Sequence, residues 1–226
     1  MHARTSFLRA AVAVAALSLA AAPAGAQAFV YPSFQGPRVV AREFNFGIAD
    51  ADDADATSLV FQWRAGRGAR SQLSLDLGYT DTNADGAFFI GGQFAQQLAT
   101  SSATTPFDVL FTVSGNVARV DSDFNDYTVL RIPVGVSAGR VFPIEGGMTI
   151  TPYLHPRFVF VHADRGNDVN NDDTELGLEF DIGGEFKFSP AFAVRLSGSF
   201  GDDDVNGDSF GVSLAWTPGV ASRTRR

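Results

Sequence analysis

The sequence predicts an all-β protein: a transmembrane antiparallel up-and-down β-barrel of about ten strands, with eight as the alternative count. Two observations predict this fold. Apolar and polar residues alternate with a period of two from Val39 to Trp216, which is typical of strands. Most alternating segments are close to the about 9 to 11 residues that a tilted membrane-spanning strand needs, whereas ordinary soluble strands average roughly five or six.

The N-terminus has the pattern of a signal for export. Arg4 and Arg9 precede an apolar run from Ala10 to Ala22, and the small residues Ala24-Gly25-Ala26 follow. The run is shorter than the about 20 residues of a membrane-spanning helix, and the small residues are typical of a signal-peptidase site. We predict cleavage near Ala26, with an uncleaved anchor as the alternative.

Four parts are predicted along the chain. A signal peptide covers residues 1–26, a periplasmic N-terminal segment 27–38, the barrel 39–216 and a C-terminal tail 217–226. The sequence contains no cysteine, which excludes disulfides and thiolate metal sites. After Ala26 no apolar run is long enough for a spanning helix, so a part that enters a membrane must form a closed barrel.

The alternation defines the strands in order, each bounded by Gly, Pro, Asn, Asp or Ser residues that favour turns. The predicted segments are Val39–Ala49, Thr57–Ala65, Ser71–Thr80, Ala87–Leu98, Phe107–Ala118, Tyr127–Gly139, Met148–Ala163, Thr174–Phe188, Phe192–Phe200 and Ser209–Trp216. Pro133, Pro152 and Pro156 fall inside two of them. Because proline cannot donate to a ladder, we expect β-bulges there.

The two faces of the segments differ in charge. The apolar faces carry one charged residue, Arg42, near the start of its strand, where an interfacial arginine costs little. The polar faces carry twelve charged residues, which are Glu43, Arg64, Asp76, Asp108, Arg131, Arg157, Glu175, Glu179, Asp181, Glu185, Lys187 and Arg195. In a narrow barrel such charges must be paired or hydrated.

Counting across turns predicts the pairs. The turn Ser189–Ala191 sets Glu185 opposite Arg195. Similar counting places Arg157 beside Glu179 or Asp181, and Glu43 near Arg64. The pairs could form a structural network that plugs the lumen, or line a narrow ion-selective pore.

Alternate connections are strongly acidic. Seventeen of the 25 acidic residues lie in the five connections Asp50–Ala56, Asp81–Gly86, Asp121–Asp126, Asp164–Asp173 and Gly201–Asp208. In an up-and-down barrel all five emerge at one end, which we expect to be extracellular, with both termini in the periplasm. A soluble lipocalin-like barrel is the alternative. Strand length, this asymmetry and the mixed charges of the polar face favour the membrane.

Three stretches resemble the small outer-membrane β-barrel proteins of Gram-negative bacteria, the eight- to ten-stranded, porin-like barrel group. They are Leu130–Val136, Asp181–Phe186 and the last segment, whose Ser209, Gly211, Leu214 and Trp216 look like the signal that the barrel assembly machinery reads. The resemblance implies an outer-membrane location, with membrane lipid and that machinery as partners. Such proteins often end at the final aromatic residue, whereas residues 217–226 follow it here.

Two acidic connections are candidate calcium sites, with ligands at Asp81, Asn83, Asp85, Asp202, Asp204 and Asn206. Both follow the D-x-[DN]-x-[DN]-G start of a calcium loop. The twelfth positions are Gly92 and Ser213, so the bidentate Glu of an EF-hand is missing. The same residues also favour hairpin turns. No cofactor is predicted beyond possible calcium, and the acidic rim should attract divalent cations.

We therefore predict a porin-like or structural outer-membrane component, with a cell-surface binding protein as the alternative. An outer-membrane enzyme is a more distant alternative, because His162 is the only histidine near the acidic rim and its side chain is expected to face outward. His155 should point into the barrel. A net charge of −8 argues against nucleic acid, which requires basic patches.

Overall fold

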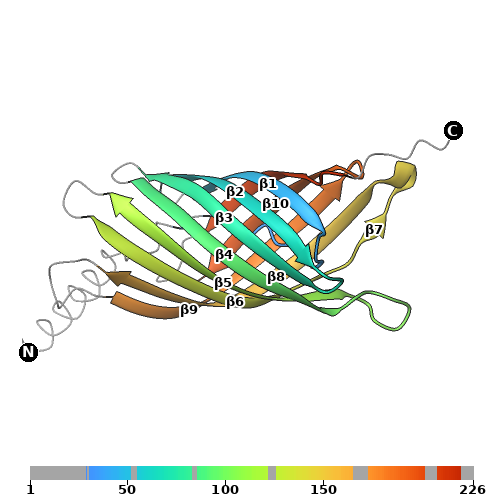
Figure 1. Ribbon diagram of the computed structural model, residues 1–226, viewed down its shortest axis with the longest axis horizontal. Helices are drawn as coiled ribbons and strands as arrows, with labels where there is room; N and C mark the ends of the chain where they lie inside the picture. Colours follow the sequence, from blue (N-terminus) through green and yellow to red (C-terminus); the bar gives the residue numbers. More distant parts are fainter. Residues whose placement is uncertain are drawn as a thin grey trace, which may run out of the picture.

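The computed structural model describes residues 29, 31–51, 55–82, 86–121, 126–164, 173–201 and 208–219. Ten long strands form the barrel (Figure 1). They are β1 (Arg42–Ala51), β2 (Ala56–Arg67), β3 (Ser71–Thr82), β4 (Gly86–Ala99), β5 (Asp108–Asp121), β6 (Tyr127–Gly139), β8 (Thr149–Asp164), β9 (Asp173–Lys187), β10 (Phe192–Gly201) and β11 (Ser209–Trp216). The prediction of ten strands is confirmed, and the alternative of eight is wrong.

Each long strand pairs antiparallel with the next long strand along the chain, including β6 with β8, and the pairing of β1 with β11 closes the sheet. The two-residue strand β7 (Phe142–Pro143) lies in the connection between β6 and β8 and pairs with the start of β8. A short 3-10 turn, η2 (Glu145–Gly147), joins β7 to β8. In the described ranges no helix is long and apolar enough to cross a membrane.

The up-and-down order gives the barrel two unlike ends. The acidic connections β1–β2, β3–β4, β5–β6, β8–β9 and β10–β11 leave at one end, hereafter the acidic end. The remaining connections leave at the opposite end, hereafter the turn end, where β7 lies at the right of Figure 1.

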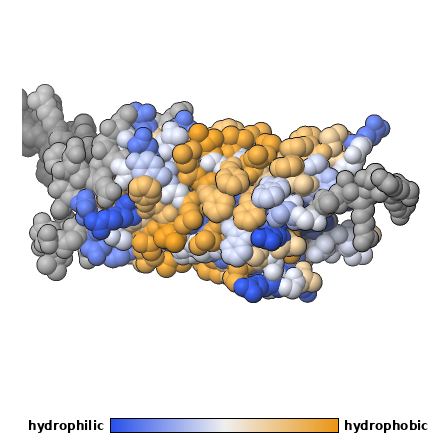
Figure 2. All heavy atoms as spheres, turned by 45° about the horizontal axis from the view of Figure 1, so that its top comes forward, coloured by the Kyte–Doolittle hydropathy of each residue, from blue (hydrophilic) through white to orange (hydrophobic). Residues whose placement is uncertain are grey.

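Period-two alternation sends apolar side chains outward and most polar ones inward. On β1, for example, Phe46 and Ile48 are exposed, whereas Glu43 and Asn45, of the opposite parity, are buried. On the face that the space-filling view shows, apolar residues form a band across the middle of the barrel, and hydrophilic residues lie toward both ends (Figure 2).

The prediction of β-bulges at Pro133, Pro152 and Pro156 is wrong. Pairing of β5 with β6 stops at Val113 opposite Val134 and resumes at Asn116 opposite Arg131, in the same register. Pro133 lies in this gap. The ladders of β8 likewise keep their register past Pro152 and Pro156. The missing N–H of each proline therefore removes a hydrogen bond from the ladder without inserting an extra residue. The register shift between paired strands lies elsewhere, between Gln97 and Ala99 of β4, where β4 pairs with β5.

The closed barrel interior

The segment that precedes β1 lies inside the barrel. Tyr31, Phe34 and Gln35 are buried, with Phe34 0% exposed. This corrects the prediction of a periplasmic segment over residues 27–38, as far as its residues are described. At the turn end the segment is anchored by an ion pair between Arg38 Nε and Asp108 Oδ2, 2.9 Å apart.

The backbone of the segment finds hydrogen-bond partners on the barrel wall. The N–H of Val39 donates to Gln97 Oε1 (3.0 Å), and the N–H of Val40 donates to Gln72 Oε1 (2.9 Å). Deeper in the lumen, Ser137 Oγ donates to the carbonyl oxygen of Gln35 (2.8 Å). Polar side chains of three different strands thus replace water as hydrogen-bond partners of the backbone of the segment.

Phe34 occupies a notch made by two glycines of the polar face. A methyl group added at Gly47 would lie 2.9 Å from the Phe34 ring, and one added at Gly211 would lie 2.6 Å from it. Because any larger residue would collide with the ring, these positions permit close approach of the segment to β1 and β11. Gly211 of the predicted assembly signal therefore also forms the seat of Phe34.

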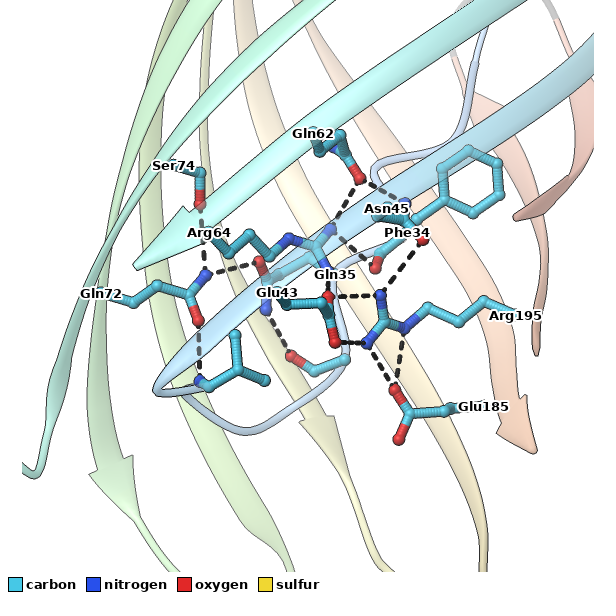
Figure 3. Close-up of polar contacts among 12 residues, drawn as sticks. Phe34, Gln35, Glu43, Asn45, Gln62, Arg64, Gln72, Ser74, Glu185 and Arg195 are labelled. Atoms are coloured by element: carbon cyan, nitrogen blue, oxygen red, sulfur yellow. Dashed lines mark hydrogen bonds and ion pairs between the residues drawn. The ribbon is translucent and has the colours of Figure 1, made fainter. Parts of the chain in front are cut away.

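Glu43, Arg64, Glu185 and Arg195 form an ion-pair group near the turn end, hereafter the turn-end cluster (Figure 3). Glu43 accepts two bonds of 2.8 Å from the guanidinium of Arg195 and one of 2.8 Å from Arg64. Arg195 Nε also donates to Glu185 (2.9 Å), which lies opposite it in the ladder between β10 and β9.

The turn-end cluster also holds the segment. Arg64 Nη2 donates to the carbonyl oxygen of Phe34 (3.0 Å) and to Gln62 Oε1 (2.7 Å). Figure 3 shows Glu43 between Arg64 and Arg195, with Phe34 and Gln35 beside them. Two negative and two positive side chains therefore balance in this cluster, which satisfies the requirement that buried charges be paired.

A second group of charges, hereafter the central cluster, consists of Arg131, His155, Arg157, Glu179 and Asp181. Arg157 Nη2 lies 2.9 Å from Glu179 and 2.7 Å from Asp181, and Arg131 also pairs with Glu179. These side chains are nearly completely buried.

Ser33 of the segment joins the central cluster. Its hydroxyl donates to Asp181 (2.8 Å) and lies 2.8 Å from Nδ1 of His155. Nε2 of His155 lies 2.9 Å from the hydroxyl of Thr112. His155 thus points inward and is held by the segment, by β5 and by β9, which is the arrangement of a structural histidine.

Toward the acidic end the lumen is apolar. Tyr31 stacks on Phe89 with ring centroids 4.9 Å apart, and Phe29 lies 5.8 Å from the same ring. The surrounding buried wall residues are Ala49, Val60, Ala87, Ala118, Val120, Tyr127, Val129, Val159, Val161 and Ala163. The segment therefore runs from the turn end into the acidic half of the barrel. Its described start, Phe29, therefore lies away from the turn end, where β1 begins.

Two small cavities border the segment. One of about 20 Å³ lies between Tyr31, Ser33, Asp76 and Asn116, which is room for about one water molecule. The other, of about 50 Å³, lies near the turn end and is lined by Pro37, Arg38 and Arg195. Asp76 is buried, and one of its carboxylate oxygens has no hydrogen-bond partner. Its ladder neighbours are Gln62 and Gly91, so no guanidinium lies directly opposite it.

The remaining predicted site residues are only partly described. Ser209 and Gly211 face the interior, whereas Leu214 and Trp216 are exposed on the outer face. Asp81 is exposed at the acidic end. The other candidate calcium ligands, Asn83, Asp85, Asp202, Asp204 and Asn206, lie outside the described residues. Within the described ranges, no group of three or more acidic or histidine side chains is arranged to hold a metal ion.

His162 lies at the acidic end, with Nδ1 2.9 Å from the hydroxyl of Thr174 on the neighbouring strand. This contact gives the ring a structural partner rather than an acidic one.

The fold and interior together define a class of protein: a closed antiparallel barrel, apolar outside and charged inside, that spans a membrane with its strands. The model of the family described as outer membrane protein beta-barrel domain matches residues 12–217. The chain belongs to this family, and it is an outer-membrane β-barrel.

Two curated relatives are similar to part of the chain. YaiT of Escherichia coli (strain K12) is 26% identical over 151 residues, which cover 60% of this chain and 16% of YaiT. YaiT of Salmonella typhimurium (strain LT2) is 28% identical over 103 residues, which cover 42% of this chain and 10% of that protein. The chain thus matches less than a fifth of the length of these relatives.

Solved outer-membrane barrels are similar at low identity. The β domain of the Bordetella autotransporter Brka is 11% identical, with a TM-score of 0.48 over 78% of this chain and 98% of that chain. KdgM porin is 7% identical, with a TM-score of 0.38 over 77% of this chain and 98% of that chain.

Proposed function

We propose that the protein is a structural outer-membrane barrel whose lumen is closed by its own N-terminal segment. The observation that carries this proposal is the set of contacts around Ser33, Phe34 and Gln35. At this level the segment touches wall residues from around the barrel, namely Gly47 (β1), Arg64 (β2), Gln72 (β3), Ser137 (β6), His155 (β8), Asp181 (β9) and Gly211 (β11).

These contacts favour a plugged barrel over an open pore. A hydrated ion that passed this level would have to displace the buried Phe34 ring and break the bonds of Arg64 and Asp181 to the segment. Each such hydrogen bond to a charged group contributes about 1.5 to 3 kcal/mol. The charged side chains therefore hold the segment against the barrel wall and do not form a ring that selects ions.

If the lumen is closed, contacts of the protein with molecules outside the cell are made by the acidic end. We place this end outside the cell, because outer-membrane barrels carry their longer connections there. Recognition by the assembly machinery through Ser209, Gly211, Leu214 and Trp216 is part of the same proposal.

Conductance in planar lipid bilayers tests the proposal. The unaltered protein should show no steady openings at about 100 mV, whereas a variant that lacks residues 29–36 should conduct. A deletion of Ser102–Thr104, three exposed residues in the connection between β4 and β5, is the control and should remain silent, because it leaves Ser101 in place beside Asp108 and Arg38. Heat-modifiable gel mobility confirms that each protein is folded. Steady openings of the unaltered barrel would contradict the proposal.

A further inference from the structure

Three exposed arginines stand at the turn end of the outer, lipid-facing surface. Arg42 is the first residue of β1, Arg67 is the last residue of β2, and Arg140 directly follows β6. By alternation each continues an apolar row: Arg42 follows the row of Phe44 and Phe46, and Arg67 follows the row that contains Trp63. We call these three residues the arginine collar.

The guanidinium groups of the arginine collar have no carboxylate partner in the part of the chain that the structure describes. Arg42 instead lies over the ring of Phe44, 5.6 Å from its centroid, and Arg140 lies 5.8 Å from the centroid of Phe142. Cation–π contacts leave the N–H groups at the guanidinium edge available to an anion. Other exposed arginines have partners within the protein: Arg38 pairs with Asp108, Arg119 pairs with Asp126, and Arg70 Nη2 donates to the carbonyl oxygen of Leu98 (3.1 Å).

The position of the collar fixes what it meets. The apolar band below it lies in the hydrocarbon of the membrane, and both tryptophans of the chain, Trp63 and Trp216, are partly exposed beside Phe44. Aromatic side chains of this kind mark the membrane interface. Arg42 lies two residues beyond Phe44, or about 7 Å further along the strand, which is the depth of lipid headgroups.

We propose that the arginine collar binds the phosphate groups of anionic phospholipids in the leaflet at the turn end. Guanidinium and phosphate form bidentate, charge-assisted hydrogen bonds, and basic residues at an interface favour anionic lipids. The acidic end has the opposite character, with exposed carboxylates at Asp50, Asp81 and Asp208. Glu145 is the exposed acid at the turn end, on the β7–β8 connection. Anionic lipid is therefore enriched around one rim of the barrel and repelled from the other.

The two tryptophans allow this proposal to be measured at Arg42 and Arg67, because they lie on β2 and β11, the neighbours of β1. The folded protein is placed in phosphatidylcholine vesicles that contain a trace of either phosphatidylglycerol or phosphatidylcholine with a dansyl-labelled acyl chain. Energy transfer from tryptophan to dansyl reports how much labelled lipid adjoins the turn end. We expect transfer to phosphatidylglycerol to exceed transfer to phosphatidylcholine by at least about threefold, and about 1 M NaCl to remove most of the difference.

The variant R42Q/R67Q/R140Q should transfer equally to the two lipids. A control with the same change of net charge at the acidic end, R119Q/T57E/T128E, should keep the preference. Should the triple variant not fold by gel mobility, R42Q alone, next to both tryptophans, should lower the preference by at least about half. Equal transfer in the unaltered protein, a preference that survives R42Q/R67Q/R140Q, or loss of the preference in the control overturns the proposal.

Discussion

Replacing Glu43 by Gln tests whether the interior charges hold the barrel together. Glu43 is 3% exposed and accepts bonds from two guanidinium groups. At an effective dielectric constant of about 20, each contact at about 4 Å between charge centres contributes about 4 kcal/mol of attraction. The amide has nearly the shape of the carboxylate but no charge, so Arg64 would remain buried without an ion-pair partner in the turn-end cluster, and Arg195 would keep only Glu185.

The loss expected for E43Q is about 3 kcal/mol of unfolding free energy, the lower end of the about 3 to 5 kcal/mol for breaking a buried pair. The lower end applies because Arg195 keeps Glu185, and Arg64 keeps Gln62 and the Phe34 carbonyl. Urea unfolding in lipid vesicles, followed by tryptophan fluorescence and by gel mobility, measures the change. E145Q, at an exposed position, is the control and should stay within about 0.5 kcal/mol of the unaltered protein.

A double-mutant cycle separates charge from shape. E43Q/R64Q restores the charge balance of the turn-end cluster. Its loss of unfolding free energy should therefore be smaller than the sum of the losses of E43Q and R64Q by at least about 1 kcal/mol. If E43Q costs less than about 1 kcal/mol, or if the two losses simply add, the cluster does not act as a coupled ionic group and the argument fails.

Two further substitutions probe the interior by the same unfolding measurement. G211A places a methyl group 2.6 Å from the Phe34 ring and should lower the unfolding free energy by about 1 to 3 kcal/mol. In G211A/F34L the smaller Leu side chain should restore at least half of this loss. An unchanged G211A would show that Phe34 is not seated there. D76N should be neutral or stabilising by up to about 1 kcal/mol, because Asp76 has an unpartnered oxygen and no ion pair among the described contacts. A loss above about 2 kcal/mol would instead mean that the charge of Asp76 has a partner.

The strands could be predicted from the sequence because alternation and turn residues are local. One face of a strand must meet lipid, so its parity is fixed, and short turns then fix the register of its neighbours. Counting across Ser189–Ala191 leads directly to the pairing of Glu185 with Arg195. The same local counting leads to Glu43 beside Arg64.

The position of the N-terminal segment could not be predicted in this way. Its residues do not alternate, and Pro32 and Pro37 give it the composition of a loop. Its contacts depend on distant positions, such as Gln72, Ser137 and Asp181. A signal was nevertheless present: Phe29, Tyr31 and Phe34 are costly to expose in water, and Gly47 and Gly211 leave space on the polar face.

The apolar layer around Phe29 and Tyr31 was missed for a different reason. Tyr127 and Val129 share a parity with Arg131 on β6, so alternation alone assigns all three to a polar lumen. The structure shows instead that the interior changes along its axis, from ion pairs near the turn end to aromatic packing near the acidic end. Parity states which residues face inward, but it does not state what they meet there.

The order of these layers explains why one short segment can close the barrel. An ionic wall alone would remain stable around water, since hydrated charges need no plug. An apolar wall around water would be less stable, because burying each large apolar side chain contributes about 1.5 to 3 kcal/mol to the stability of the fold. Phe29 and Tyr31 cover the apolar layer, while Ser33 and the Phe34 carbonyl complete the bonds of the charged layers. Closure thus follows from the match between the sequence of the segment and the successive layers of the wall.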